Sequence, residues 1–551
     1  MRPGAVLWPA SLATLAALAV LAGCSGGGSG TASAGGTVSG SGGGGQGSTV
    51  FGTDVLTYHD DAMRSGQDLS ETVLTPQNVN ATSFGKLRML ATDGLVDAAP
   101  LIVSGLTVQG AKRNVVYVAT ENDSVYAYDA DSGALLAQVS LLGKGETPSD
   151  PRGCGQVTPE IGITSTPVID MSAGPDGTLF VVAMSKDGSG NYYQRLHALD
   201  LLTLADRIAP QTIQATASGN GPNSSGGMLQ FNPAQYKERS ALTLLNGRIY
   251  LGFASHCDID PYNGWLMAYD ESTLAQTGVL AITPNGSEGA IWDTGGMTAD
   301  ASGNLYVTIA NGTFDPTLNA QGMPSQQDFG NAALKIATGG ALAVTDYFTP
   351  YDTVSESAND VDFGSGSMLL LVDQTDAAGQ VHQLMLAGGK DGNLYVLDRN
   401  NMGHFNAAGD QVYEHIAVGG SLFSAPAYFN GTVYICDAGD TLKAYTFADA
   451  LLPSSPSSQT SVTFAYPGTS PAISADGTGN AIVWAVQSAV GSPAVLYAFN
   501  PADLGQEYYD STQAAGGRDG FGDGNKFITP VIANGKVFVG TPSGVAVFGL
   551  L

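Results

Sequence analysis

The stretch VVYVATENDSVYAYDADSG, residues 115–133, sets the pattern on which the rest of the chain is built. Side chains from Val115 to Ala119 alternate with a period of two, which is typical of a β-strand. A polar break follows, and the alternation resumes at Val125 before Asp129 begins a second turn. Asp, Ser and Gly suit such turns because they bond their own backbone or adopt positive φ. The stretch therefore predicts one hairpin of a repeated sheet.

Variants of this hairpin recur almost to the C-terminus. Each unit opens with a strand marked by Pro, Ser or Gly, passes a Gly-containing turn and continues into a strand rich in Val and Tyr. Such a unit cannot bury itself alone and must stack against its copies. About eight units, spaced by roughly 45 to 75 residues, fit four-stranded propeller blades with insertions. We predict an all-β fold, a closed β-propeller, with eight blades favoured over seven.

The last unit ends at Leu551 without an outermost strand. Residues 85–90, ahead of the first complete unit, could supply that strand. The pairing would join the two ends of the domain and leave no free sheet edge. We therefore expect an N-terminal strand to close the ring.

The composition agrees with short strands and tight turns. Among 551 residues, 74 are Gly and only 13% are charged, so long helices are not expected. The formal net charge is -28, whereas nucleic-acid binding rests on Lys and Arg that neutralise phosphates. We therefore expect no nucleic-acid partner, and we interpret the acidic surface as a solubility device.

The N-terminus carries the features of an export signal. Arg2 precedes an apolar run over residues 5–22, and Leu21-Ala22-Gly23-Cys24 resembles a bacterial lipobox. That resemblance implies a mature protein that begins at a lipidated Cys24. Because Ser25 follows, and not Asp, the resemblance implies the outer membrane if the cell is Gram-negative. A simple cleaved signal peptide is the alternative.

Three regions follow from this pattern. Residues 1–24 form the signal peptide with its lipobox, residues 25–49 a Gly/Ser-rich flexible tether, and residues 50–551 a single propeller domain. We expect a monomer in the bacterial cell envelope that contacts the membrane through its lipid anchor, on either the periplasmic or the surface face.

Three cysteines remain once Cys24 is assigned to the lipid. Cys154 and Cys257 both lie in long polar connections, and an envelope location permits disulfides, so we predict that these two pair. Cys436 lies in a predicted strand and is interpreted as a small buried hydrophobe. The alternative is that all three are reduced.

The repeats resemble those of the quinoprotein alcohol dehydrogenase-like propellers, whose cofactor is pyrroloquinoline quinone (PQQ), over most of residues 50–551. The segment TYHDDAMRSG, residues 57–66, is similar to the segment that precedes the first blade in many bacterial members. In quinoprotein dehydrogenases the quinone lies on the propeller axis beside a calcium ion. The resemblance therefore implies an axial site.

Three residues match the family's site motifs in chain order. Asn311 stands where the family has an amide ligand to calcium. Asp362 lies in a segment that resembles the one carrying the proposed general base. Lys390 opens KDGNLYVLDR, residues 390–399, which resembles the segment whose cation contacts the quinone oxygens. Function must still be argued from the site and not from the fold.

Other positions depart from the family. Its adjacent Cys-Cys pair is absent. Its calcium-binding Glu has no clear counterpart, and Asp258 or Asp260 is only nearby. A stacking floor for a ligand could come from Trp265 or Trp292, although an indole at either position is equally typical of a propeller core.

Two functions follow from these features. The favoured one is an envelope-anchored propeller that binds a ligand or a protein as a scaffold, with an envelope protein or a glycan as partner. The alternative is a PQQ- and calcium-dependent alcohol or sugar dehydrogenase that uses Asp362 as base, Asn311 as metal ligand and Lys390 as quinone contact. Long connecting loops over residues 214–238 and 314–331 are candidate recognition segments, because loops carry sites on rigid scaffolds.

Overall fold

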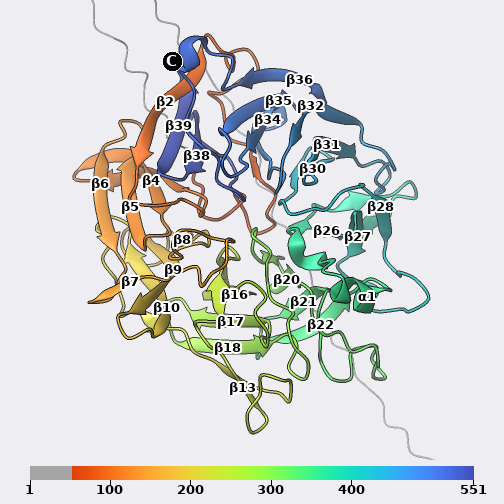
Figure 1. The fold of residues 1–551 in the computed structure, drawn as a ribbon. Coiled ribbons are helices and arrows are strands. Elements are labelled where there is room, and N and C mark those ends of the chain that lie inside the picture. Colours follow the sequence, from red (N-terminus) through yellow and green to blue (C-terminus); the bar gives the residue numbers. More distant parts are fainter. Residues whose placement is uncertain (1–51) are drawn as a thin grey trace, which may run out of the picture. The chain divides into compact units, whose positions relative to one another are not determined.

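A computed structural model describes residues 52–551, which form a ring of β-sheets around a central axis (Figure 1). The one α-helix of these residues is the short α1 (Thr353–Ala358). Within this range, no helix is long and apolar enough to cross a membrane. The predicted signal peptide, Cys24 and tether lie outside the described residues.

The hairpin that sets the sequence pattern forms as predicted. β4 (Ala111–Ala119) and β5 (Ser124–Asp129) pair antiparallel, with Val116 opposite Tyr128 and Val118 opposite Tyr126. Pairs of β-branched and aromatic side chains stabilise antiparallel sheets. Both faces of β5 are buried, because a neighbouring blade covers each side of the sheet.

Eight blades make up the ring, which confirms the favoured count. In chain order they are β3 (Leu101–Val108), β4, β5 and β6 (Leu135–Ser140); β8 (Val168–Asp170), β9 (Thr178–Asp187), β10 (Tyr192–Asp200) and β11 (Gln211–Thr212); β15 (Thr243–Leu245), β16 (Arg248–Ser255), β17 (Trp265–Asp270) and β18 (Gln276–Ala281); β19 (Thr298–Ala299), β20 (Asn304–Thr308), β21 (Ala333–Ala337) and β22 (Ala343–Phe348); β23 (Leu369–Leu370), β26 (Leu384–Gly388), β27 (Asn393–Asp398) and β28 (Glu414–Ala417); β29 (Ala427–Phe429), β30 (Thr432–Cys436), β31 (Asp440–Thr446) and β32 (Ser458–Phe464); β33 (Ala472–Asp476), β34 (Gly479–Gln487), β35 (Val495–Asn500) and β36 (Asp503–Asp510); and β37 (Val531–Ala533), β38 (Lys536–Thr541), β39 (Gly544–Leu550) and β2 (Phe84–Ala91).

Shorter elements decorate the blades and their connections. They are β1 (Gln67–Asp68), β7 (Glu146–Pro148), β12 (Thr216–Ser218), β13 (Met228–Gln230), β14 (Tyr236–Glu238), β24 (Gln374–Thr375), β25 (Val381–His382) and the 3-10 turns η1 (Phe363–Ser365) and η2 (Ala515–Gly517).

The ring is closed by its first long strand. β2 pairs antiparallel with β39, with Phe84 opposite Leu550 and Ala91 opposite Gly544. Figure 1 shows the orange β2 beside the blue β39. The prediction that residues 85–90 supply the missing outer strand is confirmed, and no blade of the described domain is left without its fourth strand.

Residues 55–71, the axial plug, contact every blade near the axis. Arg64 donates from Nη2 to the Leu242 carbonyl and Thr243 Oγ1 of blade three, and Glu71 Oε2 accepts the Gly535 amide of blade eight. The plug's backbone bonds to at least one residue in each of the other six blades, among them Ile102, Ile169, Ala299, Leu370, Tyr428 and Ile473.

Arg64 is the most heavily bonded side chain of the axial plug. It is buried, with 1% of its surface exposed, and its Nη1 also donates to Thr57 Oγ1 at 2.5 Å and the Tyr58 carbonyl at 2.9 Å. Burial lowers the pKa of Arg64 to about 10, against the opposing charge of Asp61. The guanidinium therefore stays charged at neutral pH and holds the plug to blade three.

We predict that Arg64→Ala lowers the free energy of unfolding by about 3 kcal/mol or more, because it leaves several buried acceptors without a donor. Urea denaturation measures the change. Lys112→Ala, an exposed cation on β4, is the control and should change stability by less than about 0.5 kcal/mol. Equal stability of the two variants would contradict the role given to the plug.

Candidate functional site

A cavity of about 250 Å³ lies at the axis. A recess of about 20 Å³ continues from it, room for about one water, with Tyr58 of the axial plug in its wall. The plug therefore forms part of the cavity's inner end. The lining residues all lie in connections between strands, and they are Gln156, Arg239, Asp258, Trp292, Thr294, Asp360, Asp362, Ser365, Lys390, Phe423, Tyr466, Lys526 and Phe527.

The three residues that match the family motifs converge: Asp362 and Lys390 line this cavity, and Asn311 lies behind them. The backbone amide of Asn311 donates to Asp362 Oδ1 at 2.7 Å, and Lys390 Nζ lies 2.6 Å from Asp362 Oδ2. Lys390 Nζ and Asn311 Nδ2 also donate to Asp360 Oδ1, at 2.8 and 3.0 Å. Gly389 permits this approach, because a Cβ there would lie 2.1 Å from the Asp362 carbonyl oxygen.

Electrostatics make Asp362 and Lys390 an ordered ion pair. Burial raises the pKa of Asp362, and the charge of Lys390 opposes that shift. Burial alone would lower the pKa of Lys390, but the two aspartates outweigh it and the pKa is raised. Each Asp362 oxygen already accepts a hydrogen bond or an ion pair. The arrangement favours a positioning role for Asp362 over that of a general base.

The described residues do not assemble a calcium site. Asn311 Oδ1 is buried without a hydrogen-bond partner and could serve one cation ligand position. Calcium takes about 6 to 8 oxygen ligands, yet Asp258 Oδ1 already accepts bonds from Ser255 and Tyr262. Across residues 52–551, no group of three or more His, Cys, Asp or Glu is placed to hold a metal.

Two residues singled out from the sequence lie away from the cavity. Trp265 begins β17 and is fully buried between blades two and three, edge-on to Phe231 at 6.0 Å. The expectation that Trp265 forms a stacking floor is wrong, because a strand position inside the ring faces the neighbouring blade. Asp260 is exposed and does not line the cavity, whereas Trp292 does.

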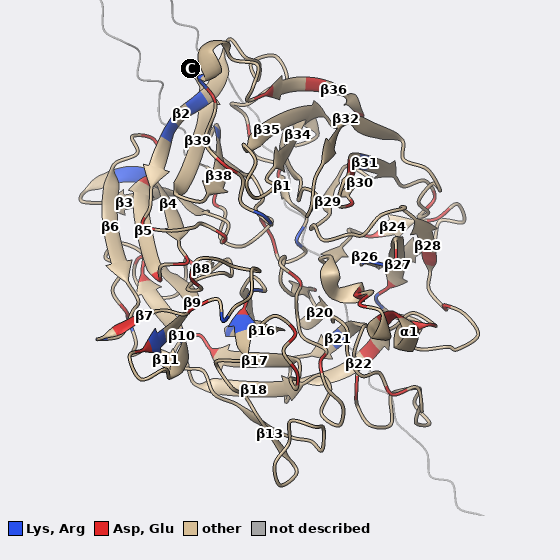
Figure 2. Cartoon of the chain, in the orientation of Figure 1, with Lys and Arg blue, Asp and Glu red and all other residues tan. Residues whose placement is uncertain are grey.

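Arg239 and Lys526 are cavity residues that the sequence did not reveal. Neither forms a hydrogen bond or an ion pair within residues 52–551. Arg239 is 6% exposed, and its Cζ lies 4.1 Å from the Phe527 ring centroid and 5.7 Å from that of Trp292. Figure 2 shows acidic residues spread around the ring and basic segments near its centre as well.

These cations reinforce one another's positive field. Burial lowers the pKa of Arg239, and burial together with the charge of Arg239 lowers the pKa of Lys526. Burial also lowers the pKa of Lys237 well below its usual range. Lys237 Nζ lies 4.8 Å from the Trp292 ring and donates to Gln156 Oε1 at 2.5 Å. The charge of Asp97 opposes these shifts at Arg239 and Lys526, and an anion in the cavity would further stabilise their charged forms.

Aromatic rings form much of the remaining wall. Phe423 and Tyr466 meet edge-on with centroids 5.1 Å apart, and Tyr466 meets Phe527 in the same way at 6.0 Å. Trp292 lines the cavity with them. Rings in this arrangement offer flat apolar surfaces to a ligand.

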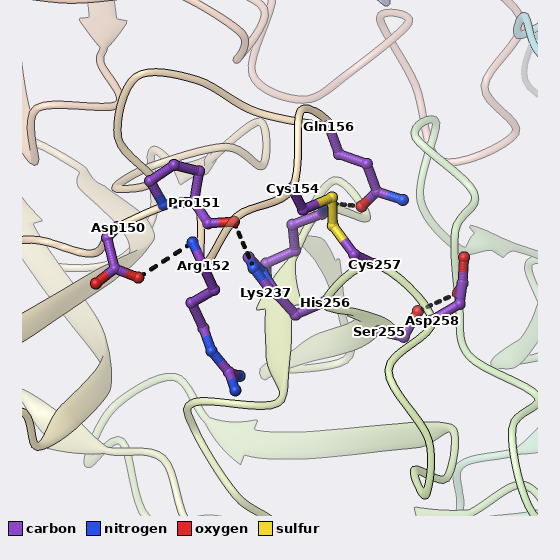
Figure 3. Close-up of a disulfide and its surroundings, with 10 residues drawn as sticks. All are labelled: Asp150, Pro151, Arg152, Cys154, Gln156, Lys237, Ser255, His256, Cys257 and Asp258. Carbon is purple, nitrogen blue, oxygen red and sulfur yellow. Dashed lines mark hydrogen bonds between the residues drawn. A yellow bond between two sulfur atoms is a disulfide. The ribbon is translucent and has the colours of Figure 1, made fainter.

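A disulfide joins Cys154 to Cys257 beside this wall, with their Cα atoms 6.1 Å apart (Figure 3). The bond links the blade-two and blade-three connections. Gln156 and Asp258, each within two residues of a bonded cysteine, both line the cavity. The pairing is the one expected from the sequence, and Cys436 is free and buried. The covalent link holds two wall loops together.

The fold and the site thus define a class of protein: an eight-bladed propeller with a polar axial cavity. No protein-family model matches the sequence, and no curated protein sequence matches it. Quinohemoprotein alcohol dehydrogenase from Comamonas testosteroni is similar in structure, at a TM-score of 0.56 and 16% identity over 90% of this chain and 80% of that one. Alcohol dehydrogenase ADHIIG from Pseudomonas putida HK5 gives 0.55 and 14% over the same shares.

A europium-containing methanol dehydrogenase also matches, at a TM-score of 0.58 and 12% identity over 90% of this chain and 98% of that one. Identities this low establish a shared fold, that of the quinoprotein dehydrogenase propellers. They do not carry over an activity.

We predict that the double variant Cys154→Ser, Cys257→Ser unfolds more easily, by up to about 4 to 5 kcal/mol, because the bond closes a loop across 103 residues. Thermal and urea denaturation measure the loss. Dithiothreitol should bring the wild type to the stability of the double variant and leave that variant unchanged. A double variant as stable as the oxidised wild type would refute the prediction.

Proposed function

We propose that the axial cavity binds a small, planar, anionic molecule, and that the chain is a ligand-binding propeller and not a calcium-dependent dehydrogenase. The observation that carries this proposal is the pair of cavity cations, Arg239 and Lys526, whose side chains form no hydrogen bond or ion pair among the described residues. An uncompensated buried charge costs free energy. A carboxylate would place its negative charge beside both cations and accept forked hydrogen bonds from the guanidinium.

The size and walls of the cavity support a small aromatic ligand. Its volume of about 250 Å³ lies just below the roughly 300–1,000 Å³ of drug-sized sites. Trp292, Phe423, Tyr466 and Phe527 line it. The carboxylates of Asp258 and Asp360 also line the cavity and would accept hydrogen bonds from ligand hydroxyl or amino groups.

A quinoprotein dehydrogenase is the second candidate. The convergence of Asn311, Asp362 and Lys390 favours it, because these positions match the family motifs. PQQ is itself a planar aromatic tricarboxylate and meets the same cations; when bound, it would accept electrons from an alcohol. The incomplete set of calcium ligands speaks against this candidate.

The lipobox ending at Cys24 supports a proposal on location. The protein would be anchored in the bacterial envelope by a lipid on this residue, with the Gly/Ser-rich tether lifting the ring off the bilayer. We propose an envelope protein or a glycan as the partner of the ring surface in that setting.

We predict that aromatic carboxylates bind without calcium. Benzoate, phthalate and PQQ are titrated into residues 25–551, which contain the whole closed ring, with calorimetry and quenching of tryptophan fluorescence as readouts. Arg239→Gln should weaken binding about 10- to 100-fold, since a hydrogen bond to a charged group contributes about 1.5–3 kcal/mol. The control is Arg248→Gln in the same blade, which should bind as the wild type does.

The stability of Arg239→Gln separates function from folding. Without ligand this variant should be as stable as the wild type or more so, because it removes an unpaired buried charge. Absence of binding by all three compounds would refute the proposed function. Binding of PQQ only with calcium, together with dye-linked alcohol oxidation, would favour the dehydrogenase.

The anchor is tested in the native host by labelling with tritiated palmitate. The full-length chain should incorporate label and fractionate with membranes, and Cys24→Ser should lose both properties because no thiol remains to be acylated. Cys436→Ser is the control and should remain labelled. Unchanged labelling of Cys24→Ser would contradict the lipobox assignment.

A further inference from the structure

A second hollow, the lateral groove, leads away from the axial cavity. It has a volume of about 550 Å³. Its apolar lining comes from Leu95, Val157, Ala465, Ala489, Val490 and Pro542, contributed by segments far apart in the chain. None of these residues takes part in the site described above. The groove therefore needs its own explanation.

The lateral groove and the axial cavity are continuous. They share Gln156, Tyr466 and Lys526, and the groove shares Asp97 with the inner recess. Lys526 stands at the junction, as one of the two cavity cations that form no hydrogen bond or ion pair within residues 52–551. A molecule whose charged group contacts Lys526 could thus extend from the cavity into the groove.

Backbone pairing fixes the outer wall of the lateral groove. Val490 forms a parallel bridge with Gly524, and the Gly524 amide donates to the Ser492 carbonyl at 2.8 Å. A Cβ on Gly524 would lie 2.5 Å from the Ser488 carbonyl carbon. This close pairing holds Val490 in place although its side chain is 67% exposed.

The exposed apolar side chains mark this wall as a contact surface. Tyr466, at the junction, is 51% exposed. Each side chain leaves apolar area in water that an apolar ligand segment would cover, at a gain proportional to the area buried. The axial cavity alone falls just below the usual volume of a ligand site, whereas cavity and groove together fall well within roughly 300–1,000 Å³.

We propose that the ligand is amphiphilic: its anionic aromatic head occupies the axial cavity against Arg239 and Lys526, and its apolar tail lies along the lateral groove against Val157 and Val490. This inference rests on the proposed function, because the head group binds where that proposal places it. The lateral groove specifies the class of ligand further: an aromatic carboxylate that carries an alkyl chain.

The test uses benzoate and the 4-alkylbenzoates from ethyl to hexyl, below their micelle concentrations, titrated into residues 25–551 by calorimetry. The wild type should bind each homologue about two- to fourfold more tightly per added methylene, up to about 0.8 kcal/mol per group. Val490→Asp should keep the affinity for benzoate and lose most of the chain-length dependence. Val381→Asp, at a valine 55% exposed on β25, is the matched control and should behave as the wild type.

The outcomes separate the two proposals. If neither benzoate nor any homologue binds, the proposed function fails and the tail inference fails with it. If benzoate binds but affinity does not rise with chain length, the proposed function stands and the lateral groove is not a tail site. A chain-length dependence that survives unchanged in Val490→Asp would also overturn the inference.

Discussion

The pairing of β2 with β39 is the constraint on which the rest of the structure depends. It joins the start of the described domain to its end, so that the eighth blade is completed by a strand that precedes the first. Every blade then has a neighbour on each side, which is why strands such as β5 are buried on both faces. The axial plug contacts all eight blades, and the loops that surround the axis are thereby held around one cavity.

That rigidity makes an unfavourable arrangement of charge possible. Arg239 and Lys526 come from blade three and from the connection that leads into blade eight, and they meet only because the ring closes. Burial opposes their charged forms, the charge of Asp97 only partly offsets that effect, and neither cation forms an ion pair among the described residues. The Asp362–Lys390 pair, by contrast, is satisfied within the protein. The unpaired cations lower the stability of the fold, whereas the Asp362–Lys390 pair does not. We therefore interpret Arg239 and Lys526 as a binding surface and Asp362–Lys390 as a structural ion pair.

Local patterns predicted most of the fold. The period of two and the turn residues of residues 115–133 were enough to infer repeated hairpins, and the incomplete last unit indicated the closing strand. Lys390 was recognisable because its neighbours form a long motif. Arg239 and Lys526 were not, since neither belongs to a recognisable motif and the surroundings of each are assembled from distant loops. Trp265 and Trp292 look alike in sequence, and only their position on a strand or in a loop separates core from cavity.

The central claim is that the axial cavity holds a planar anion through Arg239, and a crystal structure with 4-bromobenzoate tests it most directly. Anomalous scattering from bromine locates the ligand independently of how its ordinary electron density is interpreted. The account predicts the carboxylate within hydrogen-bond distance of the Arg239 guanidinium, the ring among Trp292, Phe527 and Tyr466, and the bromine directed toward the lateral groove. Bromine density elsewhere on the ring surface, with only water beside Arg239, would contradict it.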